Sequence, residues 1–367
     1  MDMTVAREAL LKPLQAVSGV VEKKQTLPIL SNVLLTTKDN NLLLTGTDLE
    51  IELVGFVPVL SMTTQGSTTV SARKLFDICR TLPEDAILRL SLEKNHLVVR
   101  AGESCFMLNT LAPQDFPNLE DSEYTAQFTL KQNQLKNMLT RTYFAMGQQD
   151  VRHYLNGTYL DISQNTIKCV AADGHRLALT SLVDEGIGNV AARIILPRKS
   201  VLELIRLLGN DQDVDVTIYI GESRFRIVTA DFIFTSKLIN AQYPDYNRLI
   251  PRSEVVATGD REVIKQALTR ASILSNEKFR GVRFQLEPSK LRITANNSDQ
   301  EQAEEAVALD YLGSAMEIGF NVAYLLDVVS AITTKTIRCA FTDPNNGVLI
   351  EPAEGDQSLY VVMPMRL

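Results

Sequence analysis

The segment A-D-G-H-R-L at residues 172–177 places an aspartate and a histidine two residues apart, beside a glycine and an arginine. A carboxylate that orients an imidazole is part of a hydrolytic triad, and the chain has only three histidines. A triad also needs a nucleophile, and the sequence has no G-x-S-x-G motif. We therefore expect no catalytic residue. Two hypotheses for this loop stay open. It is part of the active site of a hydrolase centred on Asp173 and His175, or it is an ordinary loop in which the His175 side chain makes a structural hydrogen bond.

The sequence also gives little support for a cofactor site or a metal site. No G-x-x-x-x-G-K-[ST] phosphate loop is present, and the glycine-rich stretch at 186–191 precedes a strand-like run where a dinucleotide fold requires a helix. The isolated cysteines and histidines do not have zinc-site or disulfide spacing: Cys79, Cys105, Cys169, Cys339, His96, His153 and His175. We expect no metal, no cofactor and reduced, mostly buried thiols.

Length and composition are those of an ordinary globular protein with two or three domains. The chain has 367 residues, 45% of them hydrophobic and 22% charged. Because no apolar run approaches the length of a transmembrane helix, we expect no membrane span. The first residues, MDMTVAREALLKPL, lack the features of a secretory signal. These observations predict a cytoplasmic location.

A repeat runs through the chain. Three segments, at 31–53, 155–179 and 280–303, each read as a strand, a short polar turn, a second strand and a loop. Corresponding loop residues are Asp48, Asp173 and Asn297, which are spaced by 125 and 124 positions. Three such periods account for the length of the chain. The loop that contains Asp173 and His175 therefore has two counterparts.

Amphipathic helices repeat with the same period. One is expected before each hairpin, at 7–17, 131–144 and 261–273, and a second after it, at 72–82, 197–208 and 321–332. Pro13 should kink the first helix or mark a late start, and Pro197 suits the first turn of its helix. We expect an α+β fold of three repeated domains, each with two helices and several strands, over residues 1–126, 127–254 and 255–367. Since no linker separates them, they should be tightly joined.

Charge is segregated between these elements. Counted over residues 5–24, 72–82, 131–142, 197–208, 260–273 and 321–335, which include the six helices and their flanks, the charge is +10. Since the whole chain carries −7, the remainder carries −17. A basic helical surface beside an acidic remainder is typical of a protein that binds a phosphate backbone. Few aromatic residues lie on these segments, which disfavours single strands. No sequence-reading motif is present either, so base-specific recognition is not indicated.

The sequence as a whole resembles those of the bacterial sliding clamps, the beta subunits of DNA polymerase III. The resemblance spans the chain and is carried by specific motifs: LPILSN at 27–32, TGTDLE at 45–50, ARKLFDICR at 72–80, DVRHYLNG at 150–157, DGHRLA at 173–178, YPDYNRLIP at 243–251, GFNVAYLLDV at 319–328 and YVVMPMRL at 360–367. It implies clamp domains with two helices packed on two antiparallel sheets. It also implies a head-to-tail homodimeric ring that encircles duplex DNA without sequence preference and has no catalytic activity.

The same resemblance implies three sets of functional residues. Partners such as the polymerase catalytic subunit, the clamp loader and repair factors would insert short linear peptides into a groove between the second and third domains, formed by Leu155, Gly174, His175, Arg176, Leu177, Pro244, Arg248, Leu249, Asn321, Tyr324, Val361, Val362, Met363, Pro364, Met365 and Arg366. DNA would be faced by Lys24, Arg73, Gln149, His153, Tyr154, Arg198, Lys199, Arg280 and Arg283. The ring interface would use Lys74, Phe106, Ile273, Leu274, Glu301, Glu304 and Glu305.

Four positions depart from the family pattern. His153 takes a place that is commonly tyrosine, and Ala172 takes one that is usually threonine, which removes a hydroxyl from the groove. Glu103 and Cys105 take places that can be arginine near the ring interface, which predicts lost or replaced ion pairs there. A protein-interaction scaffold that does not encircle DNA is the alternative function.

Overall fold

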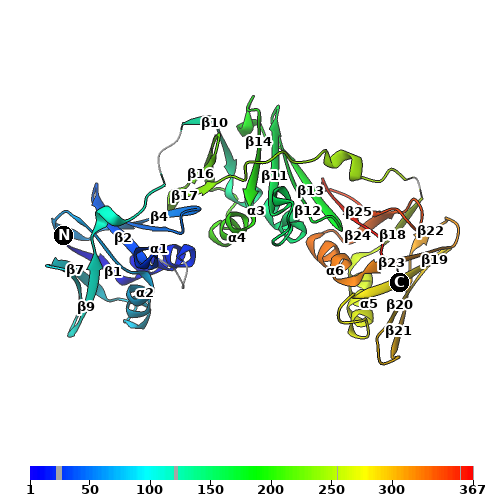
Figure 1. Cartoon of the computed structure of the whole chain (residues 1–367), viewed down its shortest axis with the longest axis horizontal. Coiled ribbons are helices and arrows are strands. Elements are labelled where there is room, and N and C mark those ends of the chain that lie inside the picture. Colours follow the sequence, from blue (N-terminus) through cyan, green and yellow to red (C-terminus); the bar gives the residue numbers. More distant parts are fainter. Residues whose placement is uncertain (22–26, 120–122, 254, 356, 367) are drawn as a thin grey trace. The chain divides into compact units, whose positions relative to one another are not determined.

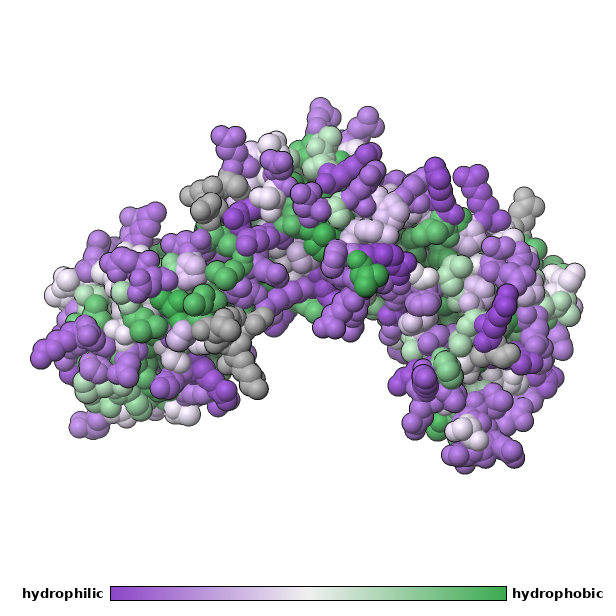
Figure 2. All heavy atoms as spheres, viewed as in Figure 1, coloured by the Kyte–Doolittle hydropathy of each residue, from purple (hydrophilic) through white to green (hydrophobic). Residues whose placement is uncertain are grey.

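The computed structural model describes residues 1–21, 27–119, 123–253, 255–355 and 357–366 (Figure 1). Their contacts divide the chain into two compact units, one formed by Met1–Gln132 with Arg206–Leu238 and the other by Asn133–Ile205 with Ile239–Leu367. In Figure 2, hydrophilic side chains cover most of the visible surface of both units, with apolar residues scattered between them. None of the helices in the described ranges is long and apolar enough to cross a membrane.

The first unit contains a 13-stranded antiparallel sheet in the order β10-β15-β16-β17-β4-β3-β2-β6-β9-β8-β7-β1-β5. Its strands are β1 (Asp2–Ala6), β2 (Asn32–Lys38), β3 (Asn41–Thr47), β4 (Ile51–Pro58), β5 (Ser61–Thr64), β6 (Ser67–Ser71), β7 (Ile87–Glu93), β8 (His96–Ala101), β9 (Ser104–Leu111), β10 (Tyr124–Lys131), β15 (Asp215–Gly221), β16 (Arg224–Val228) and β17 (Phe232–Lys237).

The second unit contains two antiparallel sheets, ordered β14-β11-β12-β13-β26-β25-β24-β18-β22 and β21-β20-β19-β23. The nine strands of the larger sheet are β11 (Gly157–Ser163), β12 (Thr166–Ala172), β13 (Arg176–Val183), β14 (Ala192–Pro197), β18 (Val256–Asp260), β22 (Asp310–Tyr311), β24 (Thr336–Ala340), β25 (Val348–Pro352) and β26 (Ser358–Val362). The smaller sheet is formed by β19 (Gly281–Glu287), β20 (Lys290–Asn296), β21 (Gln302–Ala308) and β23 (Met316–Asn321).

The three predicted hairpins are confirmed. Strands β2–β3, β11–β12 and β19–β20 pair in antiparallel registers. The turns of the first two contain adjacent residues with positive φ, Asp39–Asn40 and Gln164–Asn165, which asparagine and aspartate tolerate better than most residues. The pattern of polar turn residues between alternating apolar residues therefore predicted these hairpins correctly.

Six α-helices lie in the described residues, two in each repeat: α1 (Arg7–Val20), α2 (Ala72–Thr81), α3 (Gln132–Thr142), α4 (Arg198–Leu207), α5 (Arg261–Ile273) and α6 (Val322–Ala331). Each predicted helical segment matches one of them, and α1 extends three residues beyond its predicted segment, to Val20. Apolar residues at helical spacing are buried, as Leu10, Leu14 and Val17 show on α1. The apolar stripe thus gives each helix the face that packs against its sheet.

Of the two alternatives for Pro13 the structure excludes the late start, and the predicted placement of Pro197 was wrong by one residue. Helix α1 begins at Arg7 and includes Pro13, so Pro13 does not mark a late start. Pro197 is the last residue of β14, opposite Gly157, and α4 begins only at Arg198. Strand β14 is an edge of its sheet, where a residue without an N–H is tolerated.

The sheets continue from one repeat into the next. Strand β4 of the first repeat pairs with β17 of the second, and β13 of the second pairs with β26 of the third. A continuous ladder of backbone hydrogen bonds joins the repeats without a linker. It also explains why the two contact-defined units do not follow the repeats. The domain boundaries near residues 126 and 254 remain predictions, and residue 254 lies outside the described ranges.

Candidate functional site

The loop after β12 is a turn closed by Asp173. Its Oδ1 accepts hydrogen bonds from the backbone N–H groups of His175 and Arg176, at 2.9 and 3.0 Å. Its Oδ2 accepts from Nε of Arg176 at 3.0 Å. A side chain that hydrogen-bonds the backbone two or three residues later is typical of a turn. The carboxylate therefore holds the backbone instead of orienting the His175 imidazole, which removes the contact on which the hydrolase hypothesis rested.

The corresponding residue of the first repeat makes the same turn, and that of the third makes a similar turn that is one residue longer. Asp48 Oδ1 accepts from the backbone N–H groups of Glu50 and Ile51. Asn297 Oδ1 accepts from those of Asp299 and Glu301. The spacing of Asp48, Asp173 and Asn297 in the sequence therefore marks a repeated structural turn.

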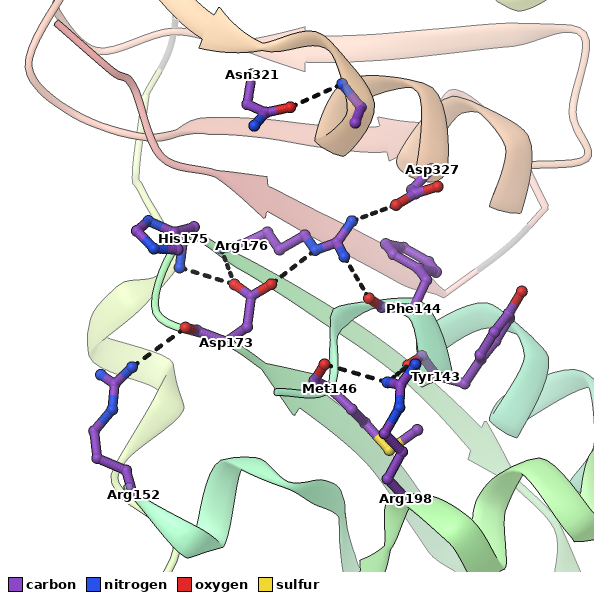
Figure 3. Close-up of polar contacts among 11 residues, drawn as sticks. Tyr143, Phe144, Met146, Arg152, Asp173, His175, Arg176, Arg198, Asn321 and Asp327 are labelled. Atoms are coloured by element: carbon purple, nitrogen blue, oxygen red, sulfur yellow. Dashed lines mark hydrogen bonds and ion pairs between the residues drawn. The ribbon is translucent and has the colours of Figure 1, made fainter. Parts of the chain in front are cut away.

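Arg176 links this turn to two other elements (Figure 3). Its Nη2 donates to the Phe144 carbonyl at 2.6 Å, and its Nη1 donates to the Asp327 carboxylate on α6. The guanidinium also lies over the Tyr324 ring, 4.5 Å from the centroid. The Arg176 side chain is only 11% exposed, and buried charges need such complete pairing. Arg176 thus fixes the positions of the turn, α6 and the segment around Phe144.

A cavity of about 260 Å³ lies beside this turn. The end of the chain forms one wall, because β26 pairs with β13 and the Met363 N–H donates to the His175 carbonyl at 2.8 Å. Its lining is mainly apolar and aromatic, with two arginines: Arg152, Tyr154, Leu155, Ala172, Gly174, Arg176, Leu177, Tyr243, Pro244, Tyr246, Leu249, Val361 and Met363. Such a groove suits an apolar peptide whose orientation is set by a few polar groups.

Tyrosines form part of the groove and its support. Tyr159 stacks on Tyr243 with ring centroids 4.7 Å apart, and Tyr154 meets Tyr243 edge-on at 6.2 Å. Burial raises the pKa of Tyr246 to about 12, so its hydroxyl stays neutral at physiological pH. The packed rings give the groove a rigid apolar base.

Arg152 and Gly174 form the rim. Arg152 donates to both carboxylate oxygens of Asp150, which lowers the pKa of Asp150 to about 2. Its Nη2 also donates to the Asp173 carbonyl at 3.3 Å. Gly174 has a φ of +88°, and a Cβ there would lie 2.8 Å from Arg152 Nη2. Both the backbone conformation and the close guanidinium therefore favour glycine.

Eight of the predicted groove residues line the cavity: Leu155, Gly174, Arg176, Leu177, Pro244, Leu249, Val361 and Met363. Arg152, Tyr243 and Tyr246 were missed, and Tyr154 had been assigned to DNA. The YPDY segment at 243–246 offered a signal, because aromatic residues are only 6% of the chain. The Arg152 contact depends on folding that sequence spacing does not reveal.

The other predicted groove residues lie outside the lining. The His175 ring stacks on Tyr324, and Val362 is buried in the strand pair. Arg248 pairs with Asp245, and Asn321 caps α6 through the Ala323 N–H. Pro364 follows Met363 beyond the end of β26.

Met365 and Arg366 contribute to a different cavity, of about 980 Å³. Residues of β19, β20 and β21 also line this second cavity, among them Gln285, Thr294 and Glu304. The last residues of the described chain therefore extend beyond the peptide groove that the sequence predicted.

The residues predicted to face DNA lie in varied settings. Arg73 on α2 is exposed, 3.7 Å from Asp77, and Lys199 is the second residue of α4. Gln149 has a positive φ in a loop, and His153 lies with Tyr154 in a 3-10 turn, His153–Leu155. Arg280 precedes β19, and Arg283 on β19 pairs with Glu317 at 2.8 Å. Arg198 donates to two backbone carbonyls, and Lys24 lies outside the described residues.

The residues predicted for the ring interface lie on or directly beside two strands and two helices. Lys74 is on α2 and Phe106 on β9. Ile273 ends α5 and is 74% exposed, and Leu274 follows it. On β21, Glu304 pairs with Arg292 and Glu305 with Arg270. Glu301 accepts a hydrogen bond from the Asn297 side chain, so all three glutamates have partners within the chain.

Comparison with known proteins assigns the family. Profiles of the N-terminal, central and C-terminal domains of the DNA polymerase III beta subunit match residues 1–120, 129–245 and 247–366. The chain belongs to the beta sliding clamp family. Proteins named beta sliding clamp from Pseudomonas putida and Escherichia coli K12 are 49% and 47% identical to it, over the whole of both chains.

Solved sliding clamps have the same fold. The clamp of Pseudomonas aeruginosa, in a structure titled as bound to griselimycin, is 49% identical and superposes with a TM-score of 0.97 over the whole of both chains. The predicted family and the α+β class with three clamp domains, each with two helices on antiparallel sheets, are confirmed. The assignment of individual residues to the groove, DNA and the ring interface remains a prediction.

We predict that Arg176→Met lowers the free energy of unfolding of its unit by about 3 kcal/mol, because Asp173 and the Phe144 carbonyl lose a largely buried charged donor. The matched control is Arg193→Met, which removes a 76% exposed partner of Asp161 and should change stability by less than about 0.5 kcal/mol. Urea denaturation of both variants gives the comparison. Equal, small effects would show that the Arg176 contacts do not support the fold.

Proposed function

We propose that this chain is a DNA sliding clamp, a replication processivity factor that closes around duplex DNA as a head-to-tail homodimer. The observation that carries the proposal is the continuation of sheets across repeats. In the described residues, two strand pairs join neighbouring repeats, and we call each of them a seam: β4–β17 and β13–β26. In each seam, the strand that follows the repeated turn pairs with a strand near the end of the next repeat. The corresponding strand of the third repeat is β21, which pairs with β20 and has no second partner strand among the residues that the structure describes.

The first repeat offers the complementary edge. Over residues 104–109, β9 pairs with β8 on one side, and within the described ranges no strand pairs with its other side there. Joining β21 of one copy to β9 of another would repeat the existing seam. An interface between different surfaces forms a closed ring when the rotation closes, and three domains per copy would give a ring of six.

Such a ring explains processivity without tight DNA binding. A closed ring leaves DNA only by opening, so its contacts with phosphates can be weak and mobile. Basic helices attract the phosphate backbone without reading bases. In this proposal the clamp is non-catalytic, works in the cytoplasm without a cofactor, and contacts DNA through the predicted basic residues.

The groove beside Asp173 would tether partners. Apolar peptide side chains would enter the cavity lined by Leu177, Pro244 and Leu249, while Arg152 and Arg176 border it. Met363 is adaptable enough to accommodate varied sequences. The partners would be the polymerase catalytic subunit, the clamp loader and repair factors. Griselimycin, bound to the Pseudomonas aeruginosa relative, would bind this groove.

We predict that the protein, once loaded onto nicked circular DNA, stays with the DNA through gel filtration and is lost after a restriction enzyme linearises it. Only a topological link depends on DNA ends. Uncut circles carried through the same column provide the control. Equal retention on both forms would indicate ordinary binding, and retention on neither would favour the scaffold without DNA encirclement.

We predict that Leu249→Asp weakens griselimycin binding at least about tenfold, because it places a charge in an apolar groove. Leu249 is 52% exposed, so the thermal unfolding midpoint should change little. Val183→Asp is the control, since Val183 is 64% exposed and lies outside the lining. Calorimetric titration measures both affinities. Unchanged affinity in Leu249→Asp would place the ligand elsewhere.

We predict a dimer whose dissociation constant changes little between about 50 mM and about 500 mM salt, a range over which exposed ion pairs are strongly screened. Glu304 and Glu305 already pair with Arg292 and Arg270, and Glu103 adds no cation to the opposing surface. Dilution sizing or native mass spectrometry across this range provides the test. A tight dimer that weakens steeply with salt would contradict the expectation.

A further inference from the structure

The segment Tyr143–Met146 directly precedes the loop that supplies Arg152, Tyr154 and Leu155 to the peptide groove, and it is held by two arginines. From β13, Arg176 Nη2 donates to the Phe144 carbonyl at 2.6 Å. From the first residue of α4, Arg198 Nη1 donates to the Tyr143 and Met146 carbonyls, both at 3.3 Å. Figure 3 shows the two guanidinium groups on either side of this segment. Three carbonyls within four residues are therefore tied to two cations.

The start of α4 also holds the neighbouring segment. The Arg198 backbone N–H donates to the Asn156 carbonyl at 2.9 Å. Asn156 in turn bonds both the N–H and the carbonyl of Asp150 through its side chain, and the Gly147 N–H donates to the Leu155 carbonyl at 2.8 Å. These bonds organise residues 147–156, which supply Arg152, Tyr154 and Leu155 to the groove.

The setting of the Arg198 side chain differs from that of a free phosphate-binding arginine. It is partly buried, and burial, followed by the charge of Arg176, lowers its pKa. Its hydrogen-bond partners among the described residues are the two carbonyls. Two like charges kept near each other are unfavourable unless their surroundings compensate, and the carbonyl oxygens on this segment supply that compensation.

We propose that Arg198 is a positioning residue for the peptide groove, one that fixes residues 143–156 without lining the cavity itself. The inference rests on the proposed function of the groove and adds to the predicted DNA role of Arg198. Without the guanidinium, the Met146 carbonyl loses the Arg198 donor, and the Tyr143 carbonyl keeps only the bond from the Met146 N–H. The groove wall then samples other conformations, and bound peptide must order it again at a cost in affinity.

We predict that Arg198→Met weakens griselimycin binding about three- to tenfold, the loss expected for one or two hydrogen bonds. Lys199→Met removes the same charge at the next position and should bind griselimycin like the unaltered protein. Arg198→Lys should recover part of the affinity, because an ammonium group can still donate to a carbonyl. Calorimetric titration of the full chain gives the dissociation constants.

Val201→Ala is the control for a general loss of stability, because it removes buried atoms from the same helix. It should lower the unfolding midpoint without changing griselimycin affinity. The inference is overturned if Arg198→Met binds within about twofold of the unaltered protein, a difference smaller than one hydrogen bond. It is also overturned if Val201→Ala loses as much affinity at an equal loss of stability.

Hydrogen exchange in the free protein tests Arg198 independently of any ligand. Arg198→Met should speed exchange of the Met146 and Gly147 amides, which donate to the Tyr143 and Leu155 carbonyls, and Lys199→Met should not. Unchanged exchange would overturn the inference. If the unaltered protein fails to bind griselimycin, the proposed groove function fails, while the exchange result still decides the role of Arg198.

Discussion

The antiparallel pairing of β13 with β26 is the constraint on which the groove depends. It joins strands more than 170 positions apart, from Arg176 opposite Val362 to Thr180 opposite Ser358. The pairing places the turn at Asp173 next to the chain's last strand, and the Met363 N–H extends the contact to His175. Since the backbone ladder fixes this register, the groove side chains are positioned by main-chain hydrogen bonds, and Arg176 then locks the turn against α6.

The same architecture at the first seam carries different side chains. Asp48 makes the turn that Asp173 makes, and β4 pairs with β17 as β13 pairs with β26. Leu49 and Ile51 stand where the second repeat has Gly174 and Arg176. Without the arginine, that turn cannot form the ion pairs that tie Arg176 to Asp173 and Asp327. Equivalent backbones thus carry different side chains, and at the second seam Arg176 ties the turn to α6 beside the proposed groove.

Local patterns predicted the fold well, and long-range contacts limited the prediction of the site. Alternating apolar residues and polar turns identified the hairpins, and helical stripes identified the six helices, because both signals arise within a few residues. The family motifs then pointed to the Asp173 loop and to Met363. Arg152 was missed because its contact with the Asp173 carbonyl joins separate loops. Pro197 was misplaced because its role as an edge-strand end depends on pairing with Gly157.

The contacts of the basic helical residues fit the proposal of a clamp that attracts DNA without binding it tightly. Arg73 and Arg80 share Asp77, so part of their charge is cancelled locally. Arg198 instead donates to two backbone carbonyls, which hold the guanidinium in place without adding a negative charge. A fixed cation contributes to the long-range field, but it cannot follow a phosphate without giving up its hydrogen bonds. Charges anchored in this way favour DNA nearby and oppose any single bound register, which is the property that the proposed sliding ring requires.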